Sequence, residues 1–128
     1  MPRGKKVMIL DPSAFFRRTL KEVIHKKVAQ VEVSEAKNAD QAKTIIEKNP
    51  PDVVFFDIAL PTENGIDFIA AIKGLVPQSR VVILTGHDSA EYESAALSNG
   101  ADYFLSKQRS SGFHMIDVIE TTVLSSGS

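Results

Sequence analysis

The stretch VVFFD at residues 53–57 places an unbroken apolar run in front of a single carboxylate. An apolar run without polar alternation is typical of a strand that is buried on both faces of a parallel sheet. Residues 7–10 and 81–84 have the same form and predict two more central strands. Residues 31–33 alternate apolar and polar side chains, and residues 103–105 form a shorter run, so both segments predict edge strands.

Between these runs, apolar residues recur at helical spacing and predict five helices. The helices are marked by Phe16, Leu20, Val23 and Ile24; by Ala42, Ile45 and Ile46; by Ile66, Ile69 and Ile72; by the segment 89–99; and by Ile116, Ile119 and Val123. Asn38 and Gln41 form a capping pair before the second helix, and Pro50 ends it. Gly100 suits the C-terminal cap of the fourth helix.

Strands that alternate with helices in this way predict an α/β fold with helices on both faces of a parallel sheet. Right-handed crossovers leave few topologies, and edge strands at 31–33 and 103–105 favour the flavodoxin-like, doubly wound order 2-1-3-4-5. We expect residues 1–128 to form a single domain, with a core from about residue 5 to residue 124.

The composition is that of an ordinary globular protein, with 43% hydrophobic residues, 24% charged residues and a formal net charge of −1. A near-neutral chain gives no support for direct nucleic-acid binding through a basic surface. The absence of cysteine excludes disulfides and zinc–thiolate sites. No apolar run reaches membrane-spanning or signal-peptide length, so we expect a cytoplasmic protein with no membrane partner.

Polar side chains follow four of the predicted strands. Asp11 follows the first strand and Asp57 the third. Thr85 and Gly86 follow the fourth strand, and Lys107 comes just after the fifth. The carboxyl ends of parallel strands meet at one edge of a sheet, so we expect these residues to converge there. Each residue alone is more often a helix cap, a turn former or a solvated lysine, and the prediction of a site therefore depends on the set.

This set suits phosphoryl transfer. Asp57 could act as a nucleophile toward a phosphoryl group and form an acyl phosphate. Phosphoryl transfer depends mainly on neutralising charge, which Lys107 and a magnesium ion held by carboxylates could supply. The hydroxyl of Thr85 could donate a hydrogen bond to a phosphoryl oxygen, and Gly86 leaves room beside the site because it lacks a side chain.

Three segments carry a family resemblance: DIALPTENG at 57–65, VILTG at 82–86 and GADYFLSK at 100–107. Together they resemble the phosphoacceptor, switch-hydroxyl and lysine segments of the receiver domain of response regulators, including the single-domain chemotaxis type. The resemblance extends from about residue 5 to residue 124. It implies a phosphoprotein of two-component signal transduction or of a phosphorelay.

The resemblance implies a role for each matching residue of the site. Asp57 would be the phosphoacceptor, receiving its phosphoryl group from a histidine of a kinase or of a histidine phosphotransfer protein. Mg²⁺ would be held by Asp11, Asp57 and the backbone carbonyl of Ala59. Lys107 would pair with the phosphorylated carboxylate. The domain would not be an enzyme beyond catalysing its own phosphoryl transfer and dephosphorylation.

The resemblance also implies a switch. Thr85 would move toward the phosphoryl group, and Phe104 would turn inward as it moves. The face formed by the fourth helix, the fifth strand and the fifth helix would then change its preference for a downstream protein or output domain.

Two positions depart from the family pattern. Pro12 stands where the family has a second acid that contacts magnesium, and proline offers no side-chain ligand. We therefore expect weakened Mg²⁺ binding, because affinity follows the charge of the ligands. Asp11 could move to the metal, or Glu63 could reach it. Gln108 replaces the proline that usually follows the lysine, so we expect a trans bond and a changed placement of Lys107.

In the family, the side chains two residues past the phosphoacceptor and two past the switch hydroxyl influence dephosphorylation. Here these residues are Ala59 and His87, next to Gly86. Ala59 cannot orient an attacking water, and His87 could either orient one or shield the site. We expect a phosphoryl group that outlasts that of a fast chemotaxis-type regulator. An ordinary loop histidine is an equally good interpretation of His87.

Two other functions remain open. The missing acid at position 12 allows an atypical receiver that acts as a phosphorylation-independent docking module. A flavin-binding enzyme is a more distant alternative, because residues 11–14 lack a phosphate cradle and Asp11 would repel the cofactor phosphate.

Overall fold

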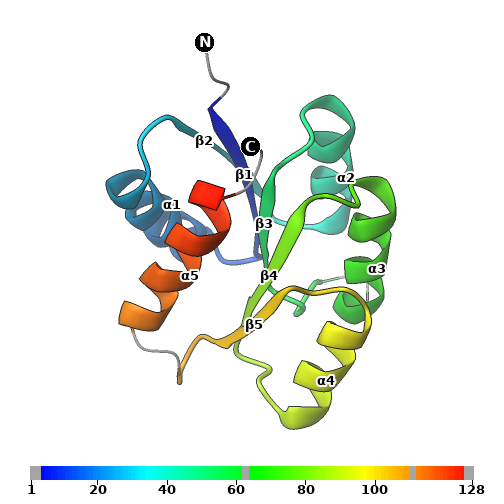
Figure 1. Ribbon diagram of the computed structural model, residues 1–128. Helices are drawn as coiled ribbons and strands as arrows, with labels where there is room; N and C mark the ends of the chain where they lie inside the picture. The colour runs from blue at the N-terminus through cyan, green and yellow to red at the C-terminus, as the bar shows by residue number, and fades with distance from the viewer. Residues whose placement is uncertain (1–3, 62–63, 110–111, 126–128) are drawn as a thin grey trace.

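The computed structural model describes residues 4–61, 64–109 and 112–125. They form a five-stranded parallel sheet in the order β2-β1-β3-β4-β5 (Figure 1). The strands are β1 Lys5–Leu10, β2 Val31–Ala36, β3 Val53–Phe56, β4 Arg80–Thr85 and β5 Tyr103–Ser106. The helices are α1 Ala14–Lys27, α2 Ala39–Lys48, α3 Gly65–Leu75, α4 Ala90–Ser98 and α5 Gly112–Ser125. The predicted flavodoxin-like α/β fold and its strand order are confirmed.

The core lies in two layers, one on each face of the sheet. Helices α1 and α5 cover one face, and α2, α3 and α4 cover the other (Figure 1). Neighbouring residues of the central strands point to opposite layers, as Phe55 and Phe56 do. Each of these two rings is almost completely buried. The unbroken apolar runs of the sequence therefore reflect strands with packed helices on both sides.

The predicted helix caps are present. Asn38 Oδ1 accepts a 2.9 Å hydrogen bond from the backbone N–H of Gln41. The Gln41 side chain reaches back to accept one from the N–H of Lys37. Gly100 follows α4 with φ +111°, a conformation that side-chain-bearing residues rarely adopt. These local signals set where the helices begin and end.

The backbone ladder continues one residue beyond the strands. The N–H of Asp57 donates to the carbonyl of Leu10 at 2.9 Å, and the N–H of Lys107 donates to the carbonyl of Thr85 at 2.9 Å. The residues that follow β3 and β5 are thus each fixed to a neighbouring strand by a backbone hydrogen bond. In the described part of the chain, none of the helices has the length and apolar character needed to cross a membrane.

Candidate functional site

Four predicted site residues meet at the carboxyl edge of the sheet. Lys107 Nζ lies 2.7 Å from Asp11 Oδ2 and 2.8 Å from Asp57 Oδ2, so one ammonium bridges the two carboxylates. Thr85 Oγ1 donates a 2.7 Å hydrogen bond to the other oxygen of Asp57. These contacts join β1, β3, β4 and β5, as the strand order requires.

Asp57 is held on both oxygens. Oδ1 accepts from Thr85 and also from the backbone N–H of Ala59 at 2.9 Å, while Oδ2 accepts from Lys107. The Thr85 hydroxyl in turn accepts from the backbone N–H of His87 at 3.1 Å. Asp57 is 7% exposed and Thr85 is fully buried. The carboxylate is therefore oriented before any donor arrives.

Asp11 is anchored by the start of α1. Its Oδ1 accepts a 2.8 Å hydrogen bond from the N–H of Ser13, which is also the N-cap of that helix. The guanidinium of Arg17 donates to the backbone carbonyl of Asp11 at 2.5 Å and pairs with Glu35 at 3.0 Å. Asp11 thus combines a structural role in the β1–α1 turn with its place in the site.

Lys107 stays charged at this edge of the sheet. Burial lowers the pKa of its ammonium. The hydrogen bonds to Asp11 and Asp57 and the negative charges of these carboxylates raise the pKa by more, so the net shift is upward. The ammonium also lies 4.1 Å from the centre of the Phe16 ring, a cation–π contact. The helical spacing of Phe16 indicated only a core residue, and no sequence signal pointed to this contact.

The peptide bond between Lys107 and Gln108 is trans, as expected, since the described residues contain no cis bond. The expected change in the placement of Lys107 stays a prediction, and its ammonium contacts both carboxylates. The side chain of Gln108 lies over Gly86: a Cβ on that glycine would approach Gln108 Nε2 to 3.1 Å.

The residues at this edge suit a hard cation, with fewer ligands than a dedicated metal cage. Asp11 and Asp57 supply buried carboxylate oxygens, and one or two carboxylates with water and backbone oxygens are what Mg²⁺ commonly uses. Pro12 is exposed and adds no ligand. Within the described ranges, no group of three or more His, Cys, Asp or Glu residues is arranged to hold a metal. Glu63 lies outside those ranges.

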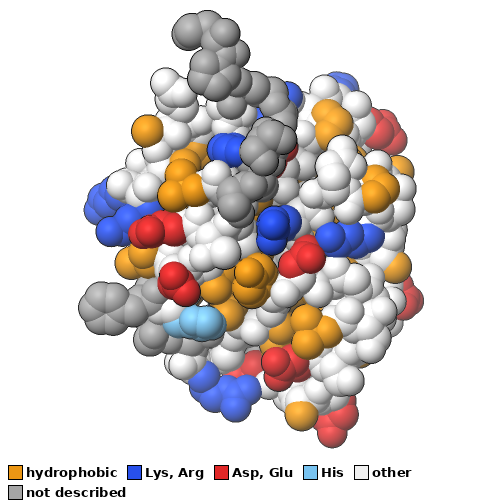
Figure 2. Space-filling model, viewed as in Figure 1, with side chains coloured by type: hydrophobic (Ala, Val, Ile, Leu, Met, Phe, Trp, Pro, Cys, Tyr) orange, Lys and Arg blue, Asp and Glu red, His pale blue; other side chains and the backbone are white. Residues whose placement is uncertain are grey.

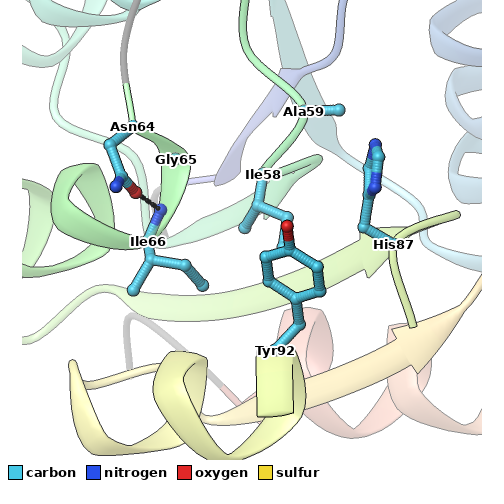
Figure 3. A pocket seen from close by; sticks show the side chains of 7 residues that line it. All are labelled: Ile58, Ala59, Asn64, Gly65, Ile66, His87 and Tyr92. Carbon is cyan, nitrogen blue, oxygen red and sulfur yellow. Dashed lines mark hydrogen bonds between the residues drawn. The ribbon is translucent and has the colours of Figure 1, made fainter. Parts of the chain in front are cut away.

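A hollow of about 300 Å³ opens beside the site, between the start of α3 and the β4–α4 loop (Figure 3). Its lining residues are Ile58, Ala59, Asn64, Gly65, Ile66, His87 and Tyr92. The rings of His87 and Tyr92 meet edge to face, with centres 5.8 Å apart. The predicted modulators Ala59 and His87 therefore border the same hollow, and the His87 ring contacts Tyr92 of α4.

Gly65 is required by a close backbone approach. A Cβ at this position would lie 2.0 Å from the carbonyl oxygen of Ile58. The start of α3 therefore presses directly on the loop that follows Asp57. Asn64, the N-cap of α3, accepts from the backbone N–H groups of Ile66 and Asp67 and fixes the same turn.

Phe104 is half-buried on β5 and packs against the layer covered by α2, α3 and α4. Its neighbour Tyr103 packs against the opposite layer. Phe104 pairs in register with Ile83 of β4, two residues before Thr85. The inward turn expected of Phe104 stays a prediction.

Comparisons with known proteins agree with this architecture. The family model described as the response regulator receiver domain matches residues 7–117. The chemotaxis protein CheY of Thermotoga maritima is 34% identical over 81% of this chain and 86% of its own length. The solved response regulator domain of Thermotoga maritima CheB has a TM-score of 0.78 at 27% identity, covering 95% of this chain and 98% of that one.

Some relatives are longer than this chain. The protein-glutamate methylesterase/protein-glutamine glutaminase of Pyrococcus horikoshii is 34% identical over 87% of this chain, which spans only 30% of that protein.

Proposed function

Because this chain belongs to the response regulator receiver family of two-component signalling, we propose that Asp57 accepts a phosphoryl group and that its phosphorylation switches a partner-binding face. The observation that carries the proposal is the arrangement around one carboxylate. Asp57 accepts hydrogen bonds from Thr85 at 2.7 Å and from Lys107 at 2.8 Å. These are donors placed where charge would build up on a transferring phosphoryl group.

Receiver domains exchange phosphoryl groups with histidine kinases, and here the proposed donor is a phosphohistidine of a kinase or of a phosphotransfer protein. An Asp57 oxygen forms the new P–O bond as the P–N bond of phosphohistidine breaks. The leaving imidazole takes up a proton from solvent. Lys107 stays protonated and neutralises the phosphoryl oxygens, while the Thr85 hydroxyl turns from Asp57 Oδ1 toward one of them.

Receiver domains generally bind Mg²⁺ for phosphorylation, and this ion would neutralise further negative charge here. Asp11, Asp57 and the backbone carbonyl of Ala59 would hold it. Lys107 already contacts both carboxylates, and Pro12 supplies no third one. Weak magnesium binding is therefore part of the proposal.

The proposed output surface is the face of α4, β5 and α5. Figure 2 shows hydrophobic side chains exposed over β5 between α4 and α5, with charged side chains around them. Leu97 of α4 is 45% exposed, and Tyr103 and Phe104 of β5 are half-buried. An apolar centre with a charged rim suits a downstream protein or output domain. A turn of Phe104 would change the shape of this surface.

Intact mass after incubation with acetyl phosphate or phosphoramidate, over a range of Mg²⁺ concentrations, tests the proposal. One phosphoryl adduct is expected on the wild-type chain. Asp57→Asn removes the nucleophile and should carry none. Asp117→Asn, an exposed change on α5, is the matched control and should be phosphorylated normally.

A second candidate function is supported by Pro12 and by the double contact of Lys107. A chain that lacks the second acid, and whose ammonium already satisfies both carboxylates, could serve as a phosphorylation-independent docking module. Absence of an adduct on the wild-type chain at every Mg²⁺ concentration would favour this function over the first.

A further inference from the structure

A polar cluster outside the site joins the loops after β4 and β5. Ser106, the last residue of β5, donates a 2.6 Å hydrogen bond to Asp88 Oδ2. Arg109 Nε lies 3.0 Å from the same oxygen, and its Nη2 donates to the backbone carbonyl of Asp88 at 2.6 Å. We call Asp88, Ser106 and Arg109 the loop clamp.

The Ser106 hydroxyl also shapes the turn that carries Lys107. Its oxygen accepts from the backbone N–H of Gln108 at 3.2 Å and from that of Arg109 at 2.9 Å. A serine side chain that accepts from the N–H groups two and three residues ahead closes a local turn around the intervening residue. That intervening residue is Lys107. A proline at position 108 could not make the first of these bonds, because it has no N–H.

The clamp thus acts on both sides of the lysine. The backbone N–H of Lys107 is held by the carbonyl of Thr85 at 2.9 Å, and Ser106 holds the two N–H groups that follow it. Asp88 fixes Ser106 from the β4–α4 loop, three residues past Thr85. Because these hydrogen bonds fix the backbone of Lys107, they limit the positions that its side-chain ammonium can reach near Asp57.

We propose that the loop clamp is a positioning device that places the Lys107 ammonium on Asp57, and that Ser106 is its central residue. The expected effect on the phosphorylation rate rests on the phosphoacceptor function proposed above. The expected effect on the position of the Lys107 ammonium does not. Among the described residues, none of the hydrogen bonds of Asp88, Ser106 and Arg109 involves Asp57, so the three clamp residues act through Lys107. The ammonium of a loosened Lys107 would lie in several places and neutralise a transferring phosphoryl group less well.

The three members contribute unequally. Ser106 is 8% exposed, and three of its hydrogen bonds would be lost together. The Arg109 side chain is 71% exposed at its contact with Asp88, and ion pairs in water contribute little. The pKa of Asp88 is lowered, first by the hydrogen bond from Ser106, with the charge of Arg109 a smaller cause. Loss of Ser106 should therefore matter most.

The test compares Ser106→Ala, Ser106→Thr and Arg109→Gln, with Arg18→Gln as the control for an exposed arginine on α1. The first measurement is the ¹⁵N NMR signal of the lysine ammonium groups in the unphosphorylated protein, at low temperature and mildly acidic pH. A hydrogen-bonded ammonium exchanges its protons slowly and gives a resolved signal. The second measurement is the rate of phosphorylation by phosphoramidate, and the third is the thermal unfolding midpoint.

Ser106→Ala should abolish the resolved Lys107 signal and slow phosphorylation roughly tenfold, because small misplacements of a reacting group carry large rate costs. Ser106→Thr keeps the hydroxyl and should restore both. Arg109→Gln should have a smaller effect, and Arg18→Gln none. Arg109→Gln keeps an exposed position and should fold even if Ser106→Ala does not.

A Lys107 signal that is unchanged in Ser106→Ala would overturn the proposal. So would loss of activity that Ser106→Thr fails to restore while the protein stays folded. If the wild-type chain accepts no phosphoryl group, the proposed function fails, but the NMR comparison still decides whether the clamp positions Lys107.

Discussion

Thr85 Oγ1 lies 2.7 Å from Asp57 Oδ1, although 28 residues separate the two in the chain. The hydroxyl has a single proton, and that proton is committed to the carboxylate. Its lone pair accepts from the N–H of His87. A phosphoryl group on Asp57 would compete for the same proton, and any movement of Thr85 would draw the β4–α4 loop with it.

The hydroxyl of Thr85 should also stabilise the fold. Thr85→Val keeps the shape of the side chain but removes a donor from Asp57 and an acceptor from His87. We expect the free energy of unfolding to fall by about 1–3 kcal/mol, the usual cost of leaving buried polar groups unpaired. Urea denaturation measures it. Thr85→Ser keeps the hydroxyl and loses only a buried methyl group, a cost of about 1 kcal/mol. Equal stability of the valine variant and the wild type would contradict the argument.

Lys107 should make stability depend on pH in the alkaline range. Its pKa in the folded chain lies above the ordinary value of 10.5, because Asp11 and Asp57 outweigh the effect of burial. The stabilisation is therefore fully present below the unfolded pKa and is lost as pH rises through the folded one. The stability gap between the wild type and Lys107→Gln should be constant near neutral pH and shrink above about pH 10.

Urea midpoints of the two proteins at matched pH values provide this measurement. Lys107→Arg is the control, since arginine stays charged throughout the range. A gap that widens with rising pH would show that the ammonium is not stabilised by the two carboxylates.

Magnesium affinity should respond to position 12. Pro12→Asp adds a carboxylate directly after Asp11, and we expect Mg²⁺ binding to tighten roughly tenfold, because affinity follows ligand charge. Isothermal titration calorimetry with MgCl₂ on the unphosphorylated protein measures it. Pro12→Asn adds an oxygen without charge and should give a smaller gain. If Pro12→Asp and the wild type bind equally, then Pro12 is not the reason for weak binding.

Two glycines of α3 should respond oppositely to alanine. Gly65→Ala forces a Cβ to within 2.0 Å of the Ile58 carbonyl oxygen, so the loop after Asp57 must shift. Gly74→Ala meets nothing within 4 Å and replaces a poor helix former. We expect Gly65→Ala to lower the free energy of unfolding, and Gly74→Ala to raise it by about 0.5–1 kcal/mol. Thermal denaturation distinguishes the two, and a harmless Gly65→Ala would contradict the close approach.

The phosphoryl group on Asp57 should be long-lived. The side chain of Ala59 has no polar atom to orient water, and the ring of His87 meets that of Tyr92 edge to face at the hollow. We expect a half-life of minutes or longer, followed by intact mass after removal of the donor. Ala59→Asn introduces a polar side chain at that place and should shorten the half-life. Hydrolysis of the wild type within seconds would contradict the prediction.

The sheet was predictable because its central strands are buried on both faces and read as unbroken apolar runs. The convergence of Asp11, Asp57, Thr85 and Lys107 followed from strand order alone, since backbone pairing fixes where each strand ends. That the ammonium touches both carboxylates did not follow, because a lysine side chain has many conformations from one backbone position.

The contacts that could not be predicted from the sequence join segments that share no repeating hydrophobic pattern. Phe16 belongs to an ordinary helical stripe, yet its ring lies beneath the Lys107 ammonium. Asp88 and Arg109 stand 21 residues apart in two loops. Such pairs depend on how loops fold over a sheet edge, and neither residue type nor spacing encodes that.

The double contact of Lys107 has a consequence for the electrostatics of incoming donors. The two carboxylates of Asp11 and Asp57 and the one ammonium of Lys107 leave the site with a single uncompensated negative charge. An acid in place of Pro12 would add a second and would repel an anionic phosphodonor more strongly. Proline at this position therefore weakens cation binding and also leaves less negative charge for a cation to neutralise. The rate at which Asp57 accepts a phosphoryl group should then depend only weakly on ionic strength.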